Sequence, residues 1–211
     1  MCSFVLNNNI IFVITKNVLF RAEHSITRRV SNQFEKFFNL PSTPLTILSL
    51  NPAFEKLSNE PGTNIYTGYL APIQFPGVSM RSVVDFVVEY DTSSLTVTCV
   101  EGGMRQSFEG NAFFANLLSK LIPDVRSCNK FKFEKSTSEL SNIAWLEIEL
   151  DLPSWFPIPA EPVQKRGSSV IQKNIETDLN ALMDKVLKKF EQFEETEERL
   201  AVCKNPFDSV D

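Results

Sequence analysis

The sequence is poor in the residues that most often carry enzyme chemistry or bind metals. It has one histidine, His24, and four cysteines that are scattered without a CxxC pair: Cys2, Cys99, Cys128 and Cys203. A structural zinc site needs four sulfur or nitrogen ligands at suitable spacing, and a disulfide framework is typical of small chains dense in cysteine. The composition therefore predicts reduced thiols, no metal and no cofactor.

The sequence also lacks a long apolar run and a basic cluster. A membrane-spanning helix needs about 20 consecutive apolar residues, and the nearest stretch, residues 10–20, is shorter and contains Lys16 and Asn17. The net charge is -5, without the clustered basic face that nucleic acid binding requires. We expect no transmembrane segment and no nucleic-acid partner, and the pattern leaves peripheral membrane contact open.

The two ends of the chain differ from the middle. No acidic residue precedes Glu23, which is a property of organelle-targeting segments. Residues 1–17 lack the arginine and serine of a strong transit peptide, so an extra strand is the alternative. Residues 196–211 predict an acidic, disordered tail. The length of 211 residues fits one domain, which we place at residues 18–195.

Period-two alternation of apolar and polar residues predicts a run of antiparallel strands. In the first, Phe20, Ala22 and His24 alternate with polar residues. A loop is expected at 71–77, and Gly102-Gly103 reads as a hairpin turn or a bulge. The expected strands are 20–30, 54–57, 65–70, 78–90, 95–101, 104–110, 129–135 and 142–152.

Helical spacing occurs in four places. Residues 31–41 predict a short helix, a second short helix or turn follows Ser42, and 111–122 has helical apolar spacing. The closing helix has Ser169 and Gln172 as a capping box. Its apolar stripe is Ile171, Ile175, Leu179, Leu182, Val186, Phe190 and Phe193. Such a stripe must be buried, and the sheet is the large apolar partner available.

This order of elements resembles the helix-grip fold of START-like (SRPBCC) proteins. The resemblance implies an α+β fold in which a curved antiparallel sheet of about seven strands wraps a long C-terminal helix. It also implies that the space between sheet and helix holds an apolar ligand. Four prolines between Pro153 and Pro162 would stiffen the crossing from the last strand to that helix.

A closer resemblance runs from about residue 18 to residue 193. It is carried by FFNLPSTPLTILS, VVDFVVEY with SLTVTCVEG, SFEGN, and LEIELDLPSWFPIPAEPVQKRGSSVIQKNI. These segments are similar to the uncharacterised cyanobacterial and plastid family known as "domain of unknown function nineteen-ninety-seven". The phenylalanines at 113–114 and the acidic tail depart from that family. The resemblance implies a chloroplast or plastid location and supplies no catalytic residues.

Eighteen phenylalanines are many for 211 residues, and they supply the candidate ligand-binding residues. Ligand cavities are mostly apolar with few polar groups, although ordinary core packing explains the same residues. Trp155 and Phe156 are expected at the cavity mouth or, alternatively, packed between strand end and helix. The candidate residues are Phe86, Phe108, Phe113, Phe114, Trp155, Phe156, Met183 and Phe190.

For each candidate catalytic residue, a structural role is better supported than a catalytic one. His24 lies on an apolar strand face, where a histidine is more often part of the core. Alternation places Asp85 opposite Phe86, so a solvated or salt-bridged carboxylate is expected there, and Glu101 and Glu109 also lie in or beside strands. Residues 164–166, Gln-Lys-Arg, are read as a solvated loop, with anion binding at the helix start as the alternative.

Three functions follow from this sequence. The first is non-enzymatic binding of a hydrophobic small molecule such as a lipid, an isoprenoid or a pigment. The second is an interaction or assembly factor of the photosynthetic apparatus, with a filled cavity and a contact face around Trp145. The third is an enzyme of the cyclase or hydrolase type, and the lack of a nucleophile–base pair argues against it.

Overall fold

The computed structural model describes residues 3–6, 9–12, 15–59, 62–75, 78–111, 124–153 and 159–204. The elements in chain order are β1 Ser3–Leu6, β2 Asn9–Phe12, β3 Thr15–Arg29, α1 Phe34–Phe38, α2 Thr43–Leu50, β4 Phe54–Asn59, β5 Ile65–Leu70, β6 Ile73–Phe75, β7 Val78–Tyr90, β8 Ser94–Gly110, β9 Asp124–Glu134, β10 Glu139–Pro153 and α4 Ala160–Lys204.

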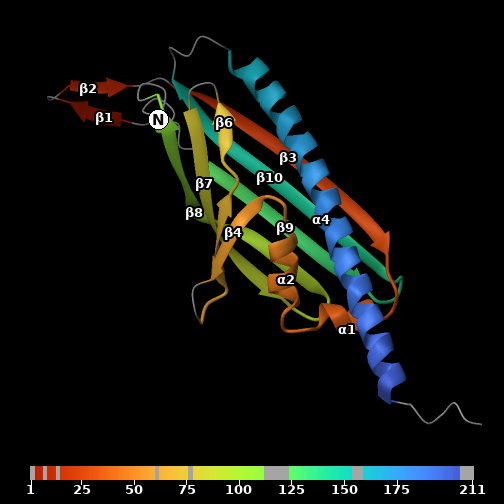
Figure 1. Cartoon of the computed structure of the whole chain (residues 1–211). Helices are drawn as coiled ribbons and strands as arrows, with labels where there is room; N and C mark the ends of the chain where they lie inside the picture. The colour runs from red at the N-terminus through yellow and green to blue at the C-terminus, as the bar shows by residue number, and fades with distance from the viewer. Residues whose placement is uncertain are drawn as a thin grey trace, which may run out of the picture.

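The main sheet is antiparallel throughout and has the order β3-β10-β9-β8-β7-β5-β4, with β6 paired to one end of β7. The first long strand therefore pairs with the last, and α1 and α2 connect the two edges. Helix α4 runs diagonally across one face of the sheet and packs chiefly against β3 (Figure 1). This seven-strand path with its long C-terminal helix confirms the predicted helix-grip α+β fold.

Two strands that the sequence analysis predicted separately form a single strand, and a segment predicted as a loop contains a short strand. Residues 95–101 and 104–110 belong to the single strand β8, because Gly102-Gly103 forms a bulge instead of a turn. The register shifts there, since Val84 pairs with Met104 and Phe86 with Cys99. A bulge bends its strand and increases the local twist. Residues 73–75, expected in a loop, pair with β7 as β6.

Helices α1 and α2 confirm the two short helices expected after the first strand. Phe34, Phe37 and Phe38 all turn inward from α1. The buried hydroxyl of Thr43, at the start of α2, donates a hydrogen bond to the carbonyl of Phe37 at 2.5 Å. This bond fixes α2 against α1 and directs Ile47 and Leu48 into the interior.

Helix α4 begins at Ala160, nine residues before the predicted capping box at Ser169. Pro162 lies in the first turn, where a proline removes no hydrogen bond within the helix. Gly167 also lies inside the helix. It packs against the ring of Phe20 on β3, and a side chain at this position would collide with that ring. The helix therefore includes Pro162 and Gly167 and begins before the capping box that the sequence analysis predicted.

Gln172 does not cap the helix. Its side chain forms hydrogen bonds with backbone groups on the exposed edge of β3. Its side-chain amide donates to the carbonyl of Glu23 at 2.8 Å and accepts from the Glu23 amide at 3.1 Å. The Ser168 hydroxyl accepts a further bond from the Arg21 amide. Because an unpaired edge strand is prone to pairing with other chains, these contacts both attach α4 and protect the edge.

The ends of the chain are also partly helix and strand. Residues 196–204, predicted in a disordered tail, continue α4 to Lys204, and the Thr196 hydroxyl bonds back to the carbonyl of Gln192. Glutamate and arginine are good helix formers, so the acidic composition does not end the helix. At the other end β1 pairs with β2 as a separate two-stranded sheet. Among the described residues, no helix is long and apolar enough to span a bilayer.

Candidate functional site

One end of the space between the sheet and α4 is filled by aromatic rings. Phe34 is fully buried, and its ring centroid lies 4.9 Å from that of Phe190 on α4 and 5.4 Å from that of Phe133 on β9. Phe37 and Phe38 complete this aromatic end with centroids 5.5 and 5.9 Å from Phe34. Separations in this range are those of packed aromatic pairs.

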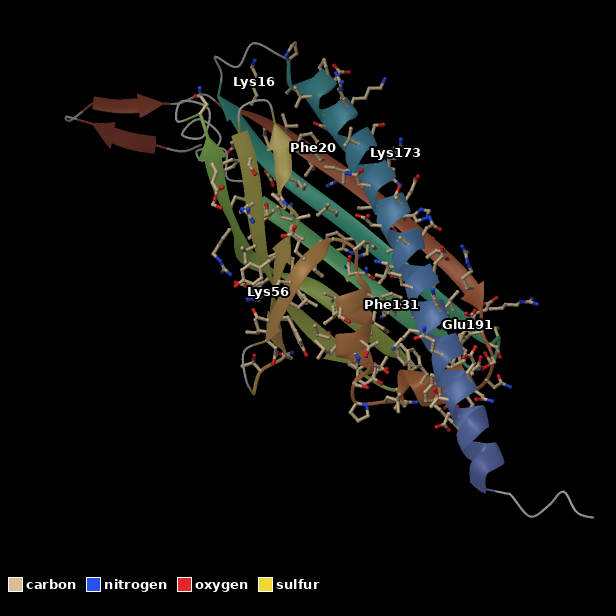
Figure 2. The ribbon with its side chains drawn as sticks, viewed as in Figure 1. Lys16, Phe20, Lys56, Phe131, Lys173 and Glu191 are labelled. Carbon is tan, nitrogen blue, oxygen red and sulfur yellow. The ribbon has the colours of Figure 1, made fainter. Side chains whose placement is uncertain are left out.

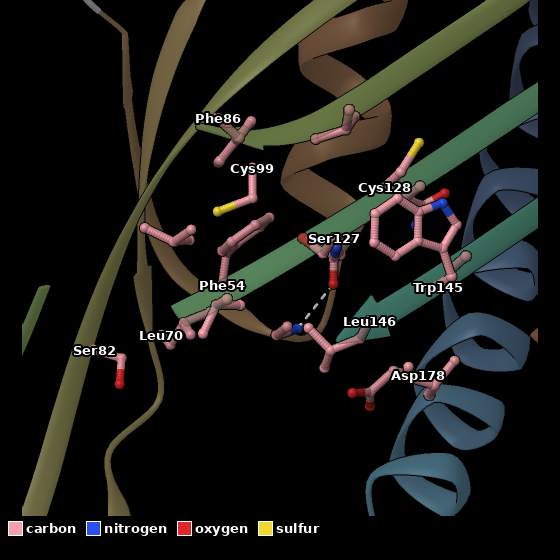
Figure 3. A pocket seen from close by; sticks show the side chains of 18 of the residues that line it. Phe54, Leu70, Ser82, Phe86, Cys99, Ser127, Cys128, Trp145, Leu146 and Asp178 are labelled. Carbon is pink, nitrogen blue, oxygen red and sulfur yellow. Dashed lines mark hydrogen bonds between the residues drawn. The ribbon is translucent and has the colours of Figure 1, made fainter. Parts of the chain in front are cut away.

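The other end of the same space contains a cavity of about 660 Å³. Its floor is the inner face of β7 to β10, and its roof is the first half of the apolar stripe of α4. Phe54 and Phe86 line one side of it, as Figure 3 shows, and Phe20 and Phe131 lie on the same covered face (Figure 2). The roof residues are Ile171, Ile175, Leu179 and Leu182.

The cavity lies beside the bulge of β8. Cys99 precedes the bulge and Met104 follows it, and both side chains line the cavity together with Gln106 and Phe108. Strand β5 contributes Gly68, where a side chain would collide with the ring of Phe54. That ring stacks on Phe86 with centroids 5.4 Å apart, so the glycine allows two rings to form the wall.

Among the described residues that line the cavity, few are polar, and all of these but one are uncharged. The uncharged ones include Ser82, Gln106, Ser127 and Asn129. Asp178 on α4 is the exception, and its carboxyl group extends from the helix toward the space it shares with the sheet (Figure 3). Burial raises the pKa of Asp178, and the positive charge of Lys185 opposes that rise.

Cys99 contributes a thiol to the wall. Burial raises the pKa of this thiol, and the charges of Asp85 and Asp124 raise it further. Because the thiolate is the reactive form, these effects make Cys99 less reactive than an ordinary thiol. Cys99 and Cys128 are both free cysteines.

The structure places the predicted ligand-binding residues in three groups. Phe86 and Phe108 line the cavity. Met183 and Phe190 are buried in the core, and neither is among the residues that line the cavity. Residues 112–122 of the helix expected at 111–122 lie outside the described residues. So do four of the candidates: Phe113, Phe114, Trp155 and Phe156.

The candidates for catalysis are dispersed. His24 is half-buried on β3 and pairs across the sheet with Ala144. Asp85 is salt-bridged on the outer face as expected, with Arg105 as its partner and a 2.7 Å bond from the Thr67 hydroxyl. That pairing holds the pKa of Asp85 below its usual value. Glu101 is exposed, so these groups form no common site.

Two further expectations concern charged groups. Residues 164–166 lie in the first two turns of α4 instead of in a loop before it. Glu109 is exposed and lies 3.9 Å from Arg81 on the neighbouring strand. No group of three or more potential metal ligands occurs within the described ranges.

The sequence analysis missed several residues of the cavity. Asp178 adjoins the stripe residues Ile175 and Leu179, and a single acid beside a helical stripe was the available signal. Phe20 and Phe54 were assigned to strands but were not named as ligand-binding residues. Ser82 and Gln106 carried no signal, because nothing in the local pattern tells a polar residue on a cavity wall from one in solvent.

Comparisons with known proteins report structural likeness alone. No family model matches the chain, and no curated protein matches its sequence. The Zhui aromatase/cyclase from Streptomyces sp. R1128 is 12% identical, with a TM-score of 0.48 over 82% of this chain and 96% of its own. A conserved protein from Geobacillus kaustophilus is 12% identical, with a TM-score of 0.44 over 80% and 96%. A START superfamily protein from Mycobacterium smegmatis is 11% identical, with a TM-score of 0.38 over 80% and 97%.

Likenesses this distant give no information on ligand or activity. The assignment of the helix-grip fold rests on the strand order of this chain and on the position of α4. Membership of the plastid family described above stays a prediction.

Proposed function

We propose that the protein binds a hydrophobic small molecule, such as a lipid, an isoprenoid or a pigment, between the sheet and α4. The observation that carries this proposal is the cavity of about 660 Å³ with its mainly apolar wall. Small-molecule sites have volumes of roughly 300–1,000 Å³ and few polar groups. A cavity of this size costs stability unless it is used, which favours a ligand as its occupant.

Burial of apolar surface would supply the affinity. A micromolar Kd corresponds to about -8 kcal/mol, and each 100 Å² of apolar surface removed from water contributes about 2.5 kcal/mol. A ligand that buries roughly 400 Å² would therefore reach about 10 kcal/mol before the entropic costs of association. The aromatic rings of Phe54 and Phe86 on the wall suit a flat or acyl ligand.

Binding without catalysis is the form of the proposal that the wall supports best. The described lining residues include one carboxyl group, Asp178, and two half-buried thiols, Cys99 and Cys128, without a histidine or a second charged group beside them. An acid–base mechanism needs a proton donor or acceptor positioned against a partner. The cavity also argues against an assembly factor whose interior is filled by its own phenylalanines. The plastid setting rests on the family resemblance alone.

The test is native mass spectrometry of the full chain purified from a photosynthetic host, followed by organic extraction and identification of what is retained. A stoichiometric apolar compound is the expected result. A neutral fluorescent dye such as Nile red, titrated into the protein purified from bacteria, provides the second measurement. An apo mass together with no saturable dye binding would overturn the proposal.

A further inference from the structure

We propose that the ligand carries a hydrogen-bond donor, as in an alcohol or an amine, and that Asp178 accepts it, so that fatty acids and other anionic amphiphiles are disfavoured. This inference rests on the proposed function, because it specifies the chemistry of the same cavity.

The first support is the position of Asp178 between residues of the cavity roof. Ile175 and Leu179 flank it on α4 and line the cavity, as Asp178 itself does. Figure 3 shows its carboxyl group on the side of α4 that faces the sheet. A side chain at this position would contact a ligand bound between α4 and the sheet.

The second support is that nothing in the described part of the chain satisfies this carboxyl group. No hydrogen bond or ion pair within it involves Asp178, whereas other acids on the surface are paired, such as Asp85 with Arg105 and Glu147 with Arg21. Asp178 is exposed, so water solvates its carboxyl group when the cavity holds no ligand. A ligand that covers this group displaces that water, and a donor on the ligand would replace the lost hydrogen bonds.

The third support is the sign of the charge on the wall. Among the described lining residues there is no lysine, arginine or histidine to balance an anionic head group. Lys185 is the cation that influences Asp178, but it is not part of the lining, and its ammonium group donates to the carbonyl of Leu50 at 3.3 Å. A carboxylate ligand would therefore meet like charge without compensation.

The experiment compares three probes that share one hydrocarbon chain: oleyl alcohol, oleylamine and oleic acid. Each displaces Nile red from the full-length protein at neutral pH, and the inhibition constants are compared. We expect oleic acid to bind at least about tenfold more weakly than the alcohol and the amine, the size of one charge-assisted hydrogen bond. In Asp178→Asn the difference should fall to about threefold or less.

Asp184→Asn is the matched control. Asp184 is exposed on the same helix, outside the cavity lining, and its substitution removes the same charge. The head-group ranking should persist in this variant. Equal binding of acid and alcohol by the unmodified protein, or the same ranking in Asp178→Asn and Asp184→Asn, would overturn the inference while leaving apolar binding intact. A protein that binds neither Nile red nor any of the probes would overturn the proposed function and this inference together.

Discussion

The two ends of the space between α4 and the sheet differ, although a single apolar stripe of α4 faces both. At the aromatic end, Phe190 packs against Phe34 and Phe37. At the cavity end, Ile171 and Ile175 face a space of about 660 Å³. The periodicity of a helix therefore identifies the buried face and not what fills the space beneath it.

The difference arises from what the connecting segments supply. The chain between β3 and β4 forms α1 and α2, and the phenylalanines of α1 fill one end of the space. At the other end, the bulge of β8 lies between two residues of the cavity wall, Cys99 and Met104. A bulge bends its strand, and a more strongly curved sheet encloses more volume under a straight helix.

The largest expected effect is the loss of Phe34. Phe34→Ala should lower the free energy of unfolding by about 3–5 kcal/mol, because a fully buried ring leaves a cavity among packed neighbours. Ile175→Ala at the cavity end should cost about 1–2 kcal/mol, since that side chain already borders empty space. Urea unfolding of both variants measures the difference. Equal costs would show that the two ends are packed alike.

Filling the cavity should abolish binding without loss of stability. In Cys99→Phe the ring would occupy the cavity, and Nile red should bind more than about tenfold more weakly, with unfolding changed by less than about 1.5 kcal/mol. Thr98→Phe is the control, because Thr98 is exposed on the opposite face of the same strand. Unchanged dye binding in Cys99→Phe would mean that the dye binds elsewhere.

The boundary between the two ends is marked by Asn142. It is fully buried between Leu140 and Ala144 on β10, and neither its amide nitrogen nor its oxygen has a hydrogen-bond partner. Replacing an unsatisfied buried amide by an apolar side chain of similar size is favourable. Asn142→Leu should therefore raise the free energy of unfolding by about 1–2 kcal/mol. A loss of stability would indicate that a buried water satisfies the amide.

The smallest expected effect concerns the ion pair behind the bulge. The hydrogen bond from Arg105 lowers the pKa of Asp85 from its usual 3.8, so the pair stabilises the fold above that pH and the contribution is lost as pH falls through the lower folded value. Asp85→Asn should cost about 1 kcal/mol or less at neutral pH, because Arg105 is largely exposed.

The pH dependence of this cost distinguishes the pair from a general effect of the substitution. The stability difference between the protein and Asp85→Asn should shrink below about pH 4. Arg105→Gln should remove the same pH-dependent component, and chemical unfolding at a series of pH values measures both variants. A difference that is constant across this range would contradict the assignment of the pair.

Most of the fold was predictable because it follows local rules. Alternation in β3, β5, β7 and β10 gave the strands, and the spacing of Phe34, Phe37 and Phe38 gave α1. The errors occurred where a local signal has two structural outcomes. Gly102-Gly103, read as a turn or a bulge, forms a bulge, so two predicted strands are one. Ser169 and Gln172 lie inside α4 instead of at its start.

The candidate site was predictable in kind and only partly in its residues. Phe86 and Phe108 line the cavity, whereas Met183 and Phe190 belong to the core. Both pairs consist of apolar residues on inward faces, so the same pattern describes a wall residue and a core residue. Asp178 was missed because an acid next to an apolar stripe normally lies in solvent.

By itself, the sequence determined which faces of the strands and of the long helix are buried, since alternation and helical spacing fix the direction of each side chain relative to its own element. The tertiary structure decided how far apart those buried faces lie. That distance depends on the bulge in β8, on the close contact of Gly167 with Phe20, and on the rings that α1 brings to one end. Two of these features are contacts between residues far apart in the chain, and the third, the bulge, is one of two conformations that Gly102-Gly103 allows. No local pattern therefore predicts whether the space is filled or empty.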